Sequence, residues 1–336
     1  MIQPTLTWPA SDPYEALRPL MQQHGACGSA RDFYWAVNRA YHTIEARDYD
    51  ALHETMFLSL EPVWRALFAH AATHPTAQLR VLDVGAGTGL VGMFAEMHLA
   101  GRLASWTMLD PCAAMLEQAR RRAELFSFPC TFHHGDLDSL GDNASFDVIT
   151  INSVLHHIVV LPAFCARVKR LLHPNGWLLT GQDPRAEAAG DPEFMARRRR
   201  WRRGRRNLYR SAWTRLGQFV RSAVGQPYLS PLAQETSLRL METEAIRRPL
   251  TMAEIYAVTD FHVPGQPGGL GRGISLGYLR NWLEGMTLVE GFTYQFHGAP
   301  WINLSRGEQA QERQWWDERD AHGELLASVW RRSLSP

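Results

Sequence analysis

The chain has 336 residues, enough for one large domain or two smaller ones. Apolar residues make up 45% of it and charged residues 21%, which excludes wholesale disorder and repetitive fibrous sequences. A net charge of +1 leaves no overall field that would attract nucleic acid or an anionic membrane. The composition therefore predicts a folded, near-neutral globular protein.

The cysteines and one apolar segment bear on the compartment. Four cysteines occur without a CxxC pair, which favours a reducing compartment over a disulfide scaffold or a zinc knuckle. The N-terminal sequence lacks the basic and apolar regions of a secretory signal. Residues 148–166 carry no Asp, Glu, Lys or Arg, but Asn152, His156 and Pro162 favour a buried strand and helix over a membrane span. We therefore expect a cytoplasmic protein without a membrane segment.

The N-terminal quarter of the chain has the pattern of helices. Aromatic and aliphatic side chains recur every three or four positions from Phe33 to Ile44, behind a capping residue, Ser29. Pro75 closes this segment, after which the pattern changes. We therefore predict a helical unit over residues 1–76.

Strands and helices alternate in the middle of the chain. Short apolar runs predict strands near 80–84, 104–109, 130–134, 147–152 and 176–181, and helical patterns lie between them near 88–100, 112–126 and 161–173. Such alternation with short connections is typical of a doubly wound α/β fold with a parallel sheet. Residues 77–182 are predicted to form this core.

The alternation stops after Thr180. Residues 183–274 are predicted to form a helical insert, with an arginine run at 197–206 and a glycine-rich loop at 264–273. A helix at 275–285, a strand at 287–297, a helix at 306–320 and an apolar segment at 325–332 follow. Residues 275–336 are therefore expected to complete the sheet.

The strongest motif is the sequence VLDVGAGTG at 81–89. Glycines at alternate positions after a strand permit a tight turn and expose backbone amides to a ligand at a helix start. Residues 87–92 also fit the dinucleotide pattern GxGxxG, with Asp110 about twenty residues further on. However, Gly85 is the first residue off the strand, and Gly92 falls inside the predicted helix. Asp83 beside the turn favours a cationic ligand that carries an amine and a sulfonium.

Several ordered motifs resemble the class I S-adenosylmethionine-dependent methyltransferases that act on small molecules. VLDVGAGTG resembles the first motif of that family, and Leu109-Asp110-Pro111 resembles the acid after its second strand. Gly135-Asp136-Leu137 resembles its third-strand loop, and FDVI at 146–149 its fourth strand. LHPNGW at 172–177 resembles the approach to its fifth strand, with Asn175 in place of a glycine. The resemblance implies a Rossmann-like core with a seven-stranded, mostly parallel sheet, and S-adenosylmethionine as the cofactor.

The same resemblance implies a set of cofactor-binding residues. In it, the methionine portion is held by the acid of the first motif and its turn, namely Asp83, Gly85, Ala86, Gly87 and Gly89. The ribose and adenine are held by residues after the second and third strands, namely Asp110, Pro111, Met115, Asp136 and Leu137. Asn152 and Ser153, after the fourth strand, complete this set.

The reacting end is expected beyond the carboxyl ends of the strands. Three segments meet there in the predicted fold, 152–157, 182–184 and 260–262. His157 or His262 is predicted to act as a base, since imidazole titrates near neutral pH. The residues predicted to contact the substrate are Tyr34, Tyr41, His156, Gln182 and Asp183. For each of these, ordinary packing or helix capping is the alternative.

The N-terminal helices are predicted to form a lid. Tyr49-Asp50 resembles a "YD" pair that closes over the cofactor in many members of the family. An aromatic ring near a sulfonium stabilises it by about 1–2 kcal/mol when water is excluded. Tyr49 is therefore predicted to act at the reacting centre.

Three other interpretations stay open: a metal-dependent methyl transfer, an RNA or anionic carrier as the partner, and cyclisation of the cofactor. Asn152 stands where magnesium-dependent relatives carry an acid, so no metal is expected, although Asp183 keeps that option. The arginine run is interpreted as a solvated or oligomer-contacting helix, with RNA or an anionic carrier as the alternative partner. Some enzymes of this fold, such as azetidine-2-carboxylate synthases, instead cyclise the cofactor and release methylthioadenosine. The hypothesis that we favour is methylation of a small metabolite in secondary metabolism, with a homodimer left open.

Overall fold

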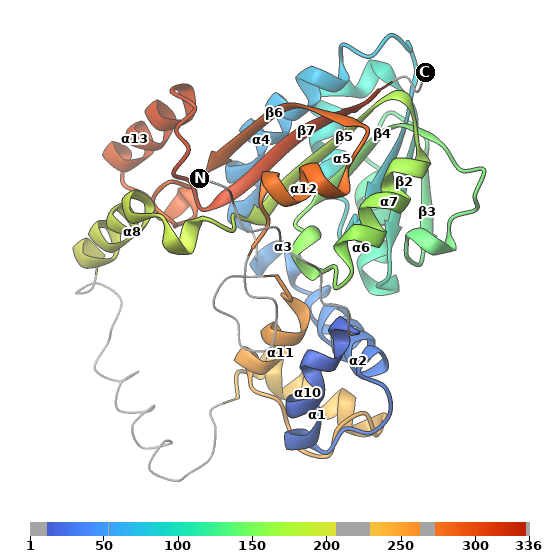
Figure 1. Cartoon of the computed structure of the whole chain (residues 1–336), viewed down its shortest axis with the longest axis vertical. Coiled ribbons are helices and arrows are strands. Elements are labelled where there is room, and N and C mark those ends of the chain that lie inside the picture. The colour runs from blue at the N-terminus through green and yellow to red at the C-terminus, as the bar shows by residue number, and fades with distance from the viewer. Residues whose placement is uncertain (1–11, 53, 206–228, 263–272, 334–336) are drawn as a thin grey trace.

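A computed structural model describes residues 12–52, 54–205, 229–262 and 273–333. Its centre is a seven-stranded sheet with the order β3-β2-β1-β4-β5-β7-β6 (Figure 1). The strands are β1 Leu79–Val84, β2 Leu103–Asp110, β3 Cys130–His134, β4 Phe146–Asn152, β5 Leu172–Pro184, β6 Met286–Tyr294 and β7 Leu325–Arg332. Strands β1 to β5 are parallel, and β7 runs antiparallel to both β5 and β6. The predicted doubly wound, mostly parallel sheet is confirmed.

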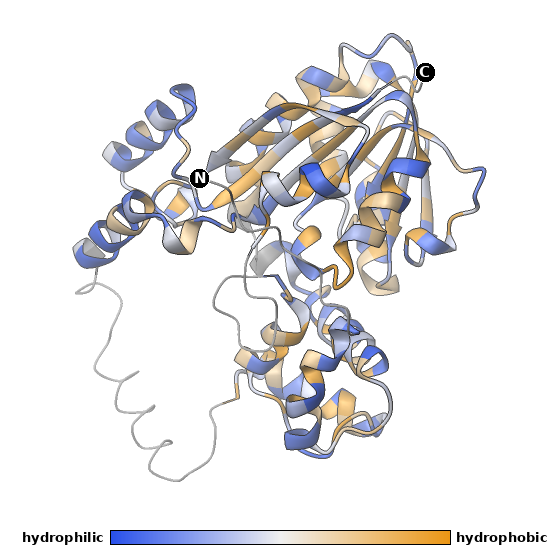
Figure 2. Ribbon diagram, in the orientation of Figure 1, coloured by the Kyte–Doolittle hydropathy of each residue, from blue (hydrophilic) through white to orange (hydrophobic). Residues whose placement is uncertain are grey.

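Alternate residues of each central strand face opposite sides of the sheet, and each side has its own apolar core. Val81 and Leu179 pack into the core formed with α4 (Glu54–Ala71), α5 (Leu90–Leu99) and α6 (Ala113–Ala123). Their neighbours Leu82 and Leu178 pack into the core under α7 (Leu161–Leu171) and α12 (Leu276–Trp282). Burial on both faces explains why these strands are continuous apolar runs (Figure 2).

Strand β5 is longer than the predicted strand at 176–181. It begins at Leu172, which pairs with Phe146, and it extends to Pro184, which pairs with Leu325. The extension follows from the neighbouring strand β7, because β7 supplies a partner for the far end of β5. The length of a strand whose partner lies some 140 residues away cannot be predicted from the local sequence pattern alone.

A smaller helical lobe covers the carboxyl ends of the strands. It comprises η1 Pro13–Leu17, α1 Arg18–His24, α2 Ala30–Glu45, α10 Pro231–Glu242 and α11 Met252–Thr259, which share one apolar cluster. Ser29 begins α2, because its side chain accepts a hydrogen bond from the backbone N–H of Asp32. The short helix α3 (Tyr49–Leu52) then leads into α4. Helices from the N-terminus and from the segment 183–274 therefore form one lobe (Figure 1).

The arginine-rich helix α8 (Pro192–Arg205) lies apart from that lobe, beside α13 (Arg306–Asp317) (Figure 1). Arg197 is buried there with its guanidinium 3.8 Å from the ring centroid of Trp315, and it pairs with Asp320 at 2.9 Å. The side chains of Arg199, Arg200, Arg202 and Arg203 are exposed. Residues 264–272 of the predicted glycine-rich loop and residue 206 of the arginine run lie outside the described residues. Within those residues, the helices are too short or too polar to cross a bilayer.

Candidate functional site

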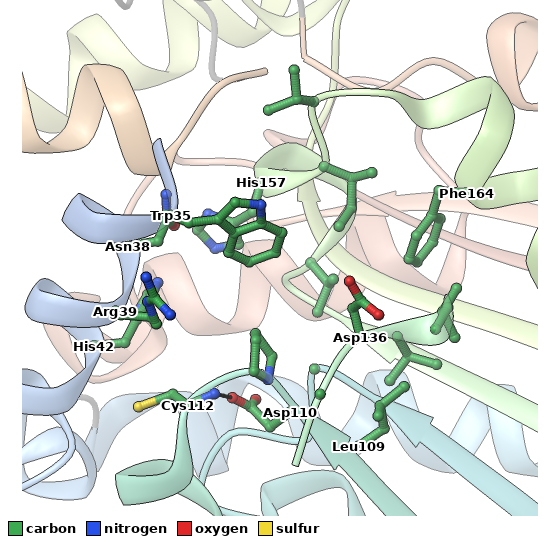
Figure 3. A pocket seen from close by; sticks show the side chains of 18 of the residues that line it. Trp35, Asn38, Arg39, His42, Leu109, Asp110, Cys112, Asp136, His157 and Phe164 are labelled. Atoms are coloured by element: carbon green, nitrogen blue, oxygen red, sulfur yellow. Dashed lines mark hydrogen bonds between the residues drawn. The ribbon is translucent and has the colours of Figure 1, made fainter. Parts of the chain in front are cut away.

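A cavity of about 450 Å³ opens where the carboxyl ends of β1 to β4 face helix α2. Val84, Asp110 and Asn152 line it at the ends of three strands, and Trp35 projects into it from α2 (Figure 3). Its far wall is apolar and comes from the segment before α7 and from the first turn of that helix, namely Val154, Ile158, Val159, Val160, Ala163 and Phe164. The cavity therefore combines a polar floor, an apolar wall and a helical cover.

The glycine turn forms the part of the floor that follows β1. Gly85, Gly87 and Gly89 all have left-handed backbones, with φ of 64°, 55° and 81°. The N–H of Gly85 donates to the carbonyl of Leu109 at 2.8 Å, which ties the turn to β2. A Cβ on Gly85 would lie 2.4 Å from a methyl of Val154, so this position requires glycine. Gly85 and Gly87 line the cavity, whereas Ala86 and Gly89 do not.

Asp110 joins the end of β2 to the glycine turn. One carboxylate oxygen accepts the N–H of Gly87 at 2.9 Å, and the other accepts the N–H of Cys112 at 2.8 Å. Burial raises the pKa of Asp110, and the two amides oppose that rise. Asp110, Pro111 and Met115 all line the cavity. The structure therefore brings together the residues expected around the ribose.

The loop after β3 supplies the next part of the wall. Asp136 caps η3 (Leu137–Ser139), because its Oδ1 accepts the backbone N–H of Asp138 at 3.1 Å and of Ser139 at 3.2 Å. Asp136 is exposed at the rim, and Leu137 is buried, and both line the cavity. The free carboxylate edge and the apolar neighbour are suited to a planar base with an exocyclic amine.

Asp83 lies beneath the cavity and does not line it. Its side chain is 1% exposed, and its Oδ1 accepts the hydroxyl of Thr150 at 2.8 Å. Burial raises the pKa of Asp83 to about 7, and the Thr150 hydrogen bond opposes that rise. Direct contact between Asp83 and a ligand stays a prediction.

Asn152 and Ser153 line the cavity after β4. The amide of Asn152 donates to the side-chain oxygen of Gln182 at 2.9 Å and accepts the indole N–H of Trp64 at 3.0 Å. Ser153 has a left-handed backbone with φ of 58°, which turns the chain toward the cavity. Gln182 holds Asn152 but does not itself line the cavity.

His156 and Asp183 pair with each other behind the cavity wall. Oδ1 of Asp183 accepts both the backbone N–H of His156 at 3.0 Å and its ring Nδ1 at 2.8 Å. Both residues are buried, and neither lines the cavity. The pair fixes η4 (Leu155–His157) to the end of β5 and thereby positions the next residue, His157.

His157 lines the cavity, and a backbone carbonyl holds its ring. Nδ1 lies 2.6 Å from the carbonyl of Thr259 and 3.6 Å from a carboxylate oxygen of Asp260. With the proton on Nδ1, the lone pair is on Nε2. Burial and the neighbouring His156 and His42 hold the pKa of His157 well below its usual value. His157 is therefore a neutral imidazole at physiological pH.

His262 lies away from the cavity, although it was the other predicted base. It is 2% exposed, and its Nε2 lies 2.8 Å from the carbonyl of Ile158. Burial lowers the pKa of His262 to about 4. Its backbone N–H donates to the carbonyl of His156, so it supports η4 from behind.

One group of side chains has the composition of a metal site. A ring nitrogen of His156, a ring nitrogen of His157 and a carboxylate oxygen of Asp260 lie within 4.8 Å of one another. Asp183 and the Thr259 carbonyl already contact Nδ1 of the two histidines. Hydrogen bonding therefore accounts for the group without an ion.

The predicted lid residues divide between the cavity and the core of the helical lobe. The hydroxyl of Tyr34 donates to the carbonyl of His157 at 2.7 Å, and Tyr34 lines the cavity. Tyr49 also lines it, beside Asp110, and burial raises the pKa of Tyr49. Tyr41 does not line the cavity, and its hydroxyl donates to Glu45 at 2.9 Å.

Five further residues of α2 line the cavity without having been among the predicted site residues. They are Arg31, Trp35, Arg39 and His42, one helical turn apart or nearly so, together with Asn38 (Figure 3). The spacing was readable as a helix face, but the same spacing describes any face that packs on a core. Only the position of α2 over the strand ends shows which face meets the cavity.

Comparison with solved structures finds methyltransferases of similar extent. The chain superimposes on a plantazolicin methyltransferase in complex with a substrate analogue and S-adenosylhomocysteine, with a TM-score of 0.43, 14% identity, and coverage of 89% of this chain and 96% of that one. It also superimposes on the N-methyltransferase NodS of Bradyrhizobium japonicum, with a TM-score of 0.39, 13% identity, and coverage of 81% and 85%.

Similar sequences include parts of much larger proteins. A hybrid polyketide–nonribosomal peptide synthetase of Macrophomina phaseolina is 31% identical over 136 residues, which are 39% of this chain and 3% of that protein. A ubiquinone biosynthesis O-methyltransferase of Methylocella silvestris is 34% identical over 106 residues, 31% of this chain and 40% of that enzyme. The chain thus spans less than half the length of each of these relatives.

A family model described as a methyltransferase domain matches residues 81–176. The matched span begins in β1 and ends in β5, so it holds the glycine turn, Asp110, Asp136 and His157. Residues 81–176 of this chain are therefore similar in sequence to a methyltransferase domain.

Proposed function

We propose that this chain transfers a methyl group from S-adenosylmethionine to a small-molecule acceptor bound in the same cavity. The observation that carries the proposal is that the cavity joins the glycine turn, Asp110 and Leu137 to an apolar wall and to His157. The first three match a sulfonium nucleoside, and the last two match an acceptor whose reacting atom must lose a proton. A binding module would need only the first half of this arrangement.

The residues on the floor fit the cofactor. A Cβ on Gly87 would meet nothing within 4 Å, so the turn leaves open space on the cavity side for a ligand to approach the backbone. Asp110 keeps lone pairs toward the ribose position while it holds the N–H of Gly87. Tyr49 and Trp35 offer aromatic faces from the lid side, which suit a sulfonium.

The apolar wall indicates the kind of acceptor. Ile158, Val160 and Phe164 line it, and Tyr34 and Trp35 face it from α2. Such a lining favours a flat or aliphatic small molecule that presents one hydroxyl or amine toward the imidazoles. The similarity to part of a hybrid polyketide–nonribosomal peptide synthetase supports a role in secondary metabolism, and the similarity to an O-methyltransferase supports a hydroxyl as the accepting group.

Methyl transfer does not require a covalent bond between the protein and either reactant. The acceptor atom attacks the methyl carbon in line, the carbon–sulfur bond breaks, and its electron pair leaves on sulfur. Orientation of the two reactants and exclusion of water by α2 and α3 supply most of the acceleration, up to about 7–11 kcal/mol in well-oriented systems. A protonated amine or a hydroxyl also needs a group that removes its proton, and the cavity wall carries two imidazoles that could do so, those of His42 and His157.

The first experiment identifies the nucleoside that the protein releases. Purified protein is incubated with S-adenosylmethionine alone, and then with a panel of catechols, phenols and primary amines, followed by mass spectrometry. We expect S-adenosylhomocysteine only when an acceptor is present. Methylthioadenosine formed without any acceptor would overturn methyl transfer in favour of intramolecular cyclisation or elimination.

A binding measurement tests the cofactor assignment separately. Calorimetry should show that S-adenosylhomocysteine binds and that NAD does not. Asp110→Ala should abolish binding, because it frees the N–H of Gly87 and removes the ribose acceptor. Asp138→Ala is the matched control, since Asp138 is exposed on the same rim and its own N–H is held by Asp136. Equal binding by both variants would contradict the assignment of Asp110.

A further inference from the structure

A histidine and a glutamate on the lid form a hydrogen-bonded pair at the edge of the cavity. Nδ1 of His42 lies 3.2 Å from Oε2 of Glu45, one turn further along α2. Glu45 is 6% exposed, and its other oxygen accepts the hydroxyl of Tyr41 at 2.9 Å. The buried carboxylate is thus held in place by two partners and directed at one ring nitrogen of His42.

Among the residues that the structure describes, Nδ1 of His42 has a hydrogen-bond partner and its Nε2 has none. A carboxylate accepts a hydrogen bond, so Glu45 selects the tautomer of His42 with the proton on Nδ1 and the lone pair on Nε2. The His42 side chain lines the cavity (Figure 3). A carboxylate in this position also stabilises the imidazolium that forms when Nε2 takes a proton.

His157 faces His42 from the strand side, and its hydrogen bond goes to a backbone carbonyl, with the carboxylate of Asp260 further away at 3.6 Å. The two rings lie edge to face with their centroids 5.7 Å apart, and both side chains line the cavity. Nδ1 of His157 contacts a neutral carbonyl, that of Thr259, at 2.6 Å. A carbonyl orients an imidazole but does less than a carboxylate to stabilise its charged form. The two imidazoles therefore differ in what holds them.

The other charged and titratable groups around His42 come from several elements. Asp110 at the end of β2 and Asp260 after α11 are close enough to interact electrostatically with His42. His157 faces it from η4, and Tyr41 and Glu45 lie on its own helix. The groups near His42 thus include three carboxyl groups, of Glu45, Asp110 and Asp260, one imidazole, and the guanidinium of Arg39, which lines the same cavity.

We propose that His42, oriented by Glu45, is the residue that removes the proton from the acceptor, and that His157 holds the acceptor in position through Nε2. The proposal rests on the function proposed above. In the step, Nε2 of His42 takes the proton of an acceptor hydroxyl as its oxygen bonds to the methyl carbon, or takes a proton from an acceptor ammonium before the resulting amine attacks that carbon, and the sulfur leaves with the electron pair of the broken carbon–sulfur bond. The imidazolium then returns its proton to water.

The assignment makes the lid part of the catalytic machinery. His42 and Glu45 lie on α2, whereas the cofactor-binding residues lie on the sheet. The proton-accepting group is therefore in place only when α2 covers the strand ends. Glu45 acts through His42 and does not line the cavity, so it is a positioning residue.

Nuclear magnetic resonance tests the pair without an acceptor. Protein with isotope-labelled histidine is titrated with acid, both alone and with S-adenosylhomocysteine, and signals are assigned through His42→Asn and His157→Asn. We expect His42 to take up its proton at a higher pH than His157. Glu45→Gln should weaken proton uptake by His42 about tenfold or more. Proton uptake by His157 before His42, or no effect of Glu45→Gln, would overturn the proposal.

This titration also separates the two proposals. If S-adenosylhomocysteine fails to bind while His42 and Glu45 titrate as expected, the proposed function fails and the pair stands as a structural fact. If the nucleoside binds and His42 stays neutral where His157 protonates, the function stands and the assignment of the base fails.

Kinetics with the panel compound that turns over fastest gives a second test. His42→Asn should lower kcat about 10²–10⁴-fold with little change in KM for the cofactor, and part of the loss should return as the pH rises. His157→Asn should mainly raise KM for the acceptor. His70→Asn is the matched control, because His70 pairs with Glu290 at 2.7 Å away from the cavity. A larger loss of kcat from His157→Asn than from His42→Asn would reverse the two roles and contradict the proposal.

Discussion

Asp50 on α3 accepts a hydrogen bond, 2.9 Å long, from the hydroxyl of Thr88, the residue that follows Gly87 in the glycine turn. Arg122 on α6 pairs with the same carboxylate and also donates to the carbonyl of Thr88 at 2.8 Å. Three side chains from three elements thus fasten the lid to the turn. The connection lies beside the cavity, so it bears on the cofactor directly.

Removing this connection should weaken cofactor binding more than it weakens the fold. Asp50 is 56% exposed, so Asp50→Ala should lower the free energy of unfolding by less than about 1 kcal/mol. The affinity for S-adenosylhomocysteine should fall about fivefold, equivalent to about 1 kcal/mol, because α3 no longer holds the turn. Calorimetry and denaturant titration measure the two quantities.

Another exposed ion pair of the lid provides the comparison for Asp50. Arg47 pairs with Glu235 at 2.6 Å and is 63% exposed, but it lies away from the turn. Arg47→Ala should leave the affinity unchanged. Equal losses of affinity in Asp50→Ala and Arg47→Ala would show that the contact with Thr88 has no special role.

Gly85 should tolerate no side chain. Its left-handed backbone costs an alanine about 1–2 kcal/mol, and the added Cβ would also lie 2.4 Å from Val154. Gly285→Ala is the matched control, because that glycine has φ of +84° and open space around it. We expect Gly85→Ala to lower the melting temperature further than Gly285→Ala, and Val154→Ala to restore part of the difference. Without such a restoration, steric overlap is not the cause.

The pairing of Asp183 with His156 should contribute strongly to stability. Asp183→Ala leaves a buried N–H and a buried ring nitrogen of His156 without an acceptor, at about 1–3 kcal/mol for each group. Asp142→Ala removes a carboxylate that is 96% exposed, and it should cost less than about 1 kcal/mol. Denaturant titration of the two variants compares them. Similar values would mean that solvent replaces Asp183 in the folded protein.

Local signals were enough to predict the sheet and the glycine turn. A strand such as β4 is buried on both faces, so its apolar run is visible in the sequence, and the left-handed backbones of Gly85 and Gly87 require the residues that stand there. Asp110 and Asp136 were predicted through their order along the chain, which the parallel sheet turns into neighbouring strand ends.

The orientation of individual side chains could not be predicted in this way. Asp183 and His156 are polar residues after adjacent strands, as a substrate site would have, yet they face each other because β5 continues past η4. His42 was visible only as part of a helix. Its place on the cavity wall depends on how α2 packs against α10 and α11, more than 180 residues away in the sequence.

The buried carboxyl of Asp83 should make stability depend on pH. Burial raises the pKa of Asp83 to about 7 in the folded protein, whereas its ordinary value is 3.8. Between these two values the folded protein holds a proton that the unfolded chain has released, so the free energy of unfolding falls as the pH rises. The contribution is constant below pH 4 and fully lost above pH 7, a change on the order of 4 kcal/mol at most.

Asp83→Asn should remove this dependence, because an amide keeps the hydrogen bond from Thr150 and does not ionise. Denaturant titrations at pH 5 and pH 8 should show the wild-type protein losing stability relative to the variant as the pH rises. Asp142→Asn, at an exposed position, should follow the wild type at both values. Wild-type and Asp83→Asn curves that run parallel from pH 5 to pH 8 would mean that Asp83 is ionised throughout, with its charge stabilised by groups other than Thr150.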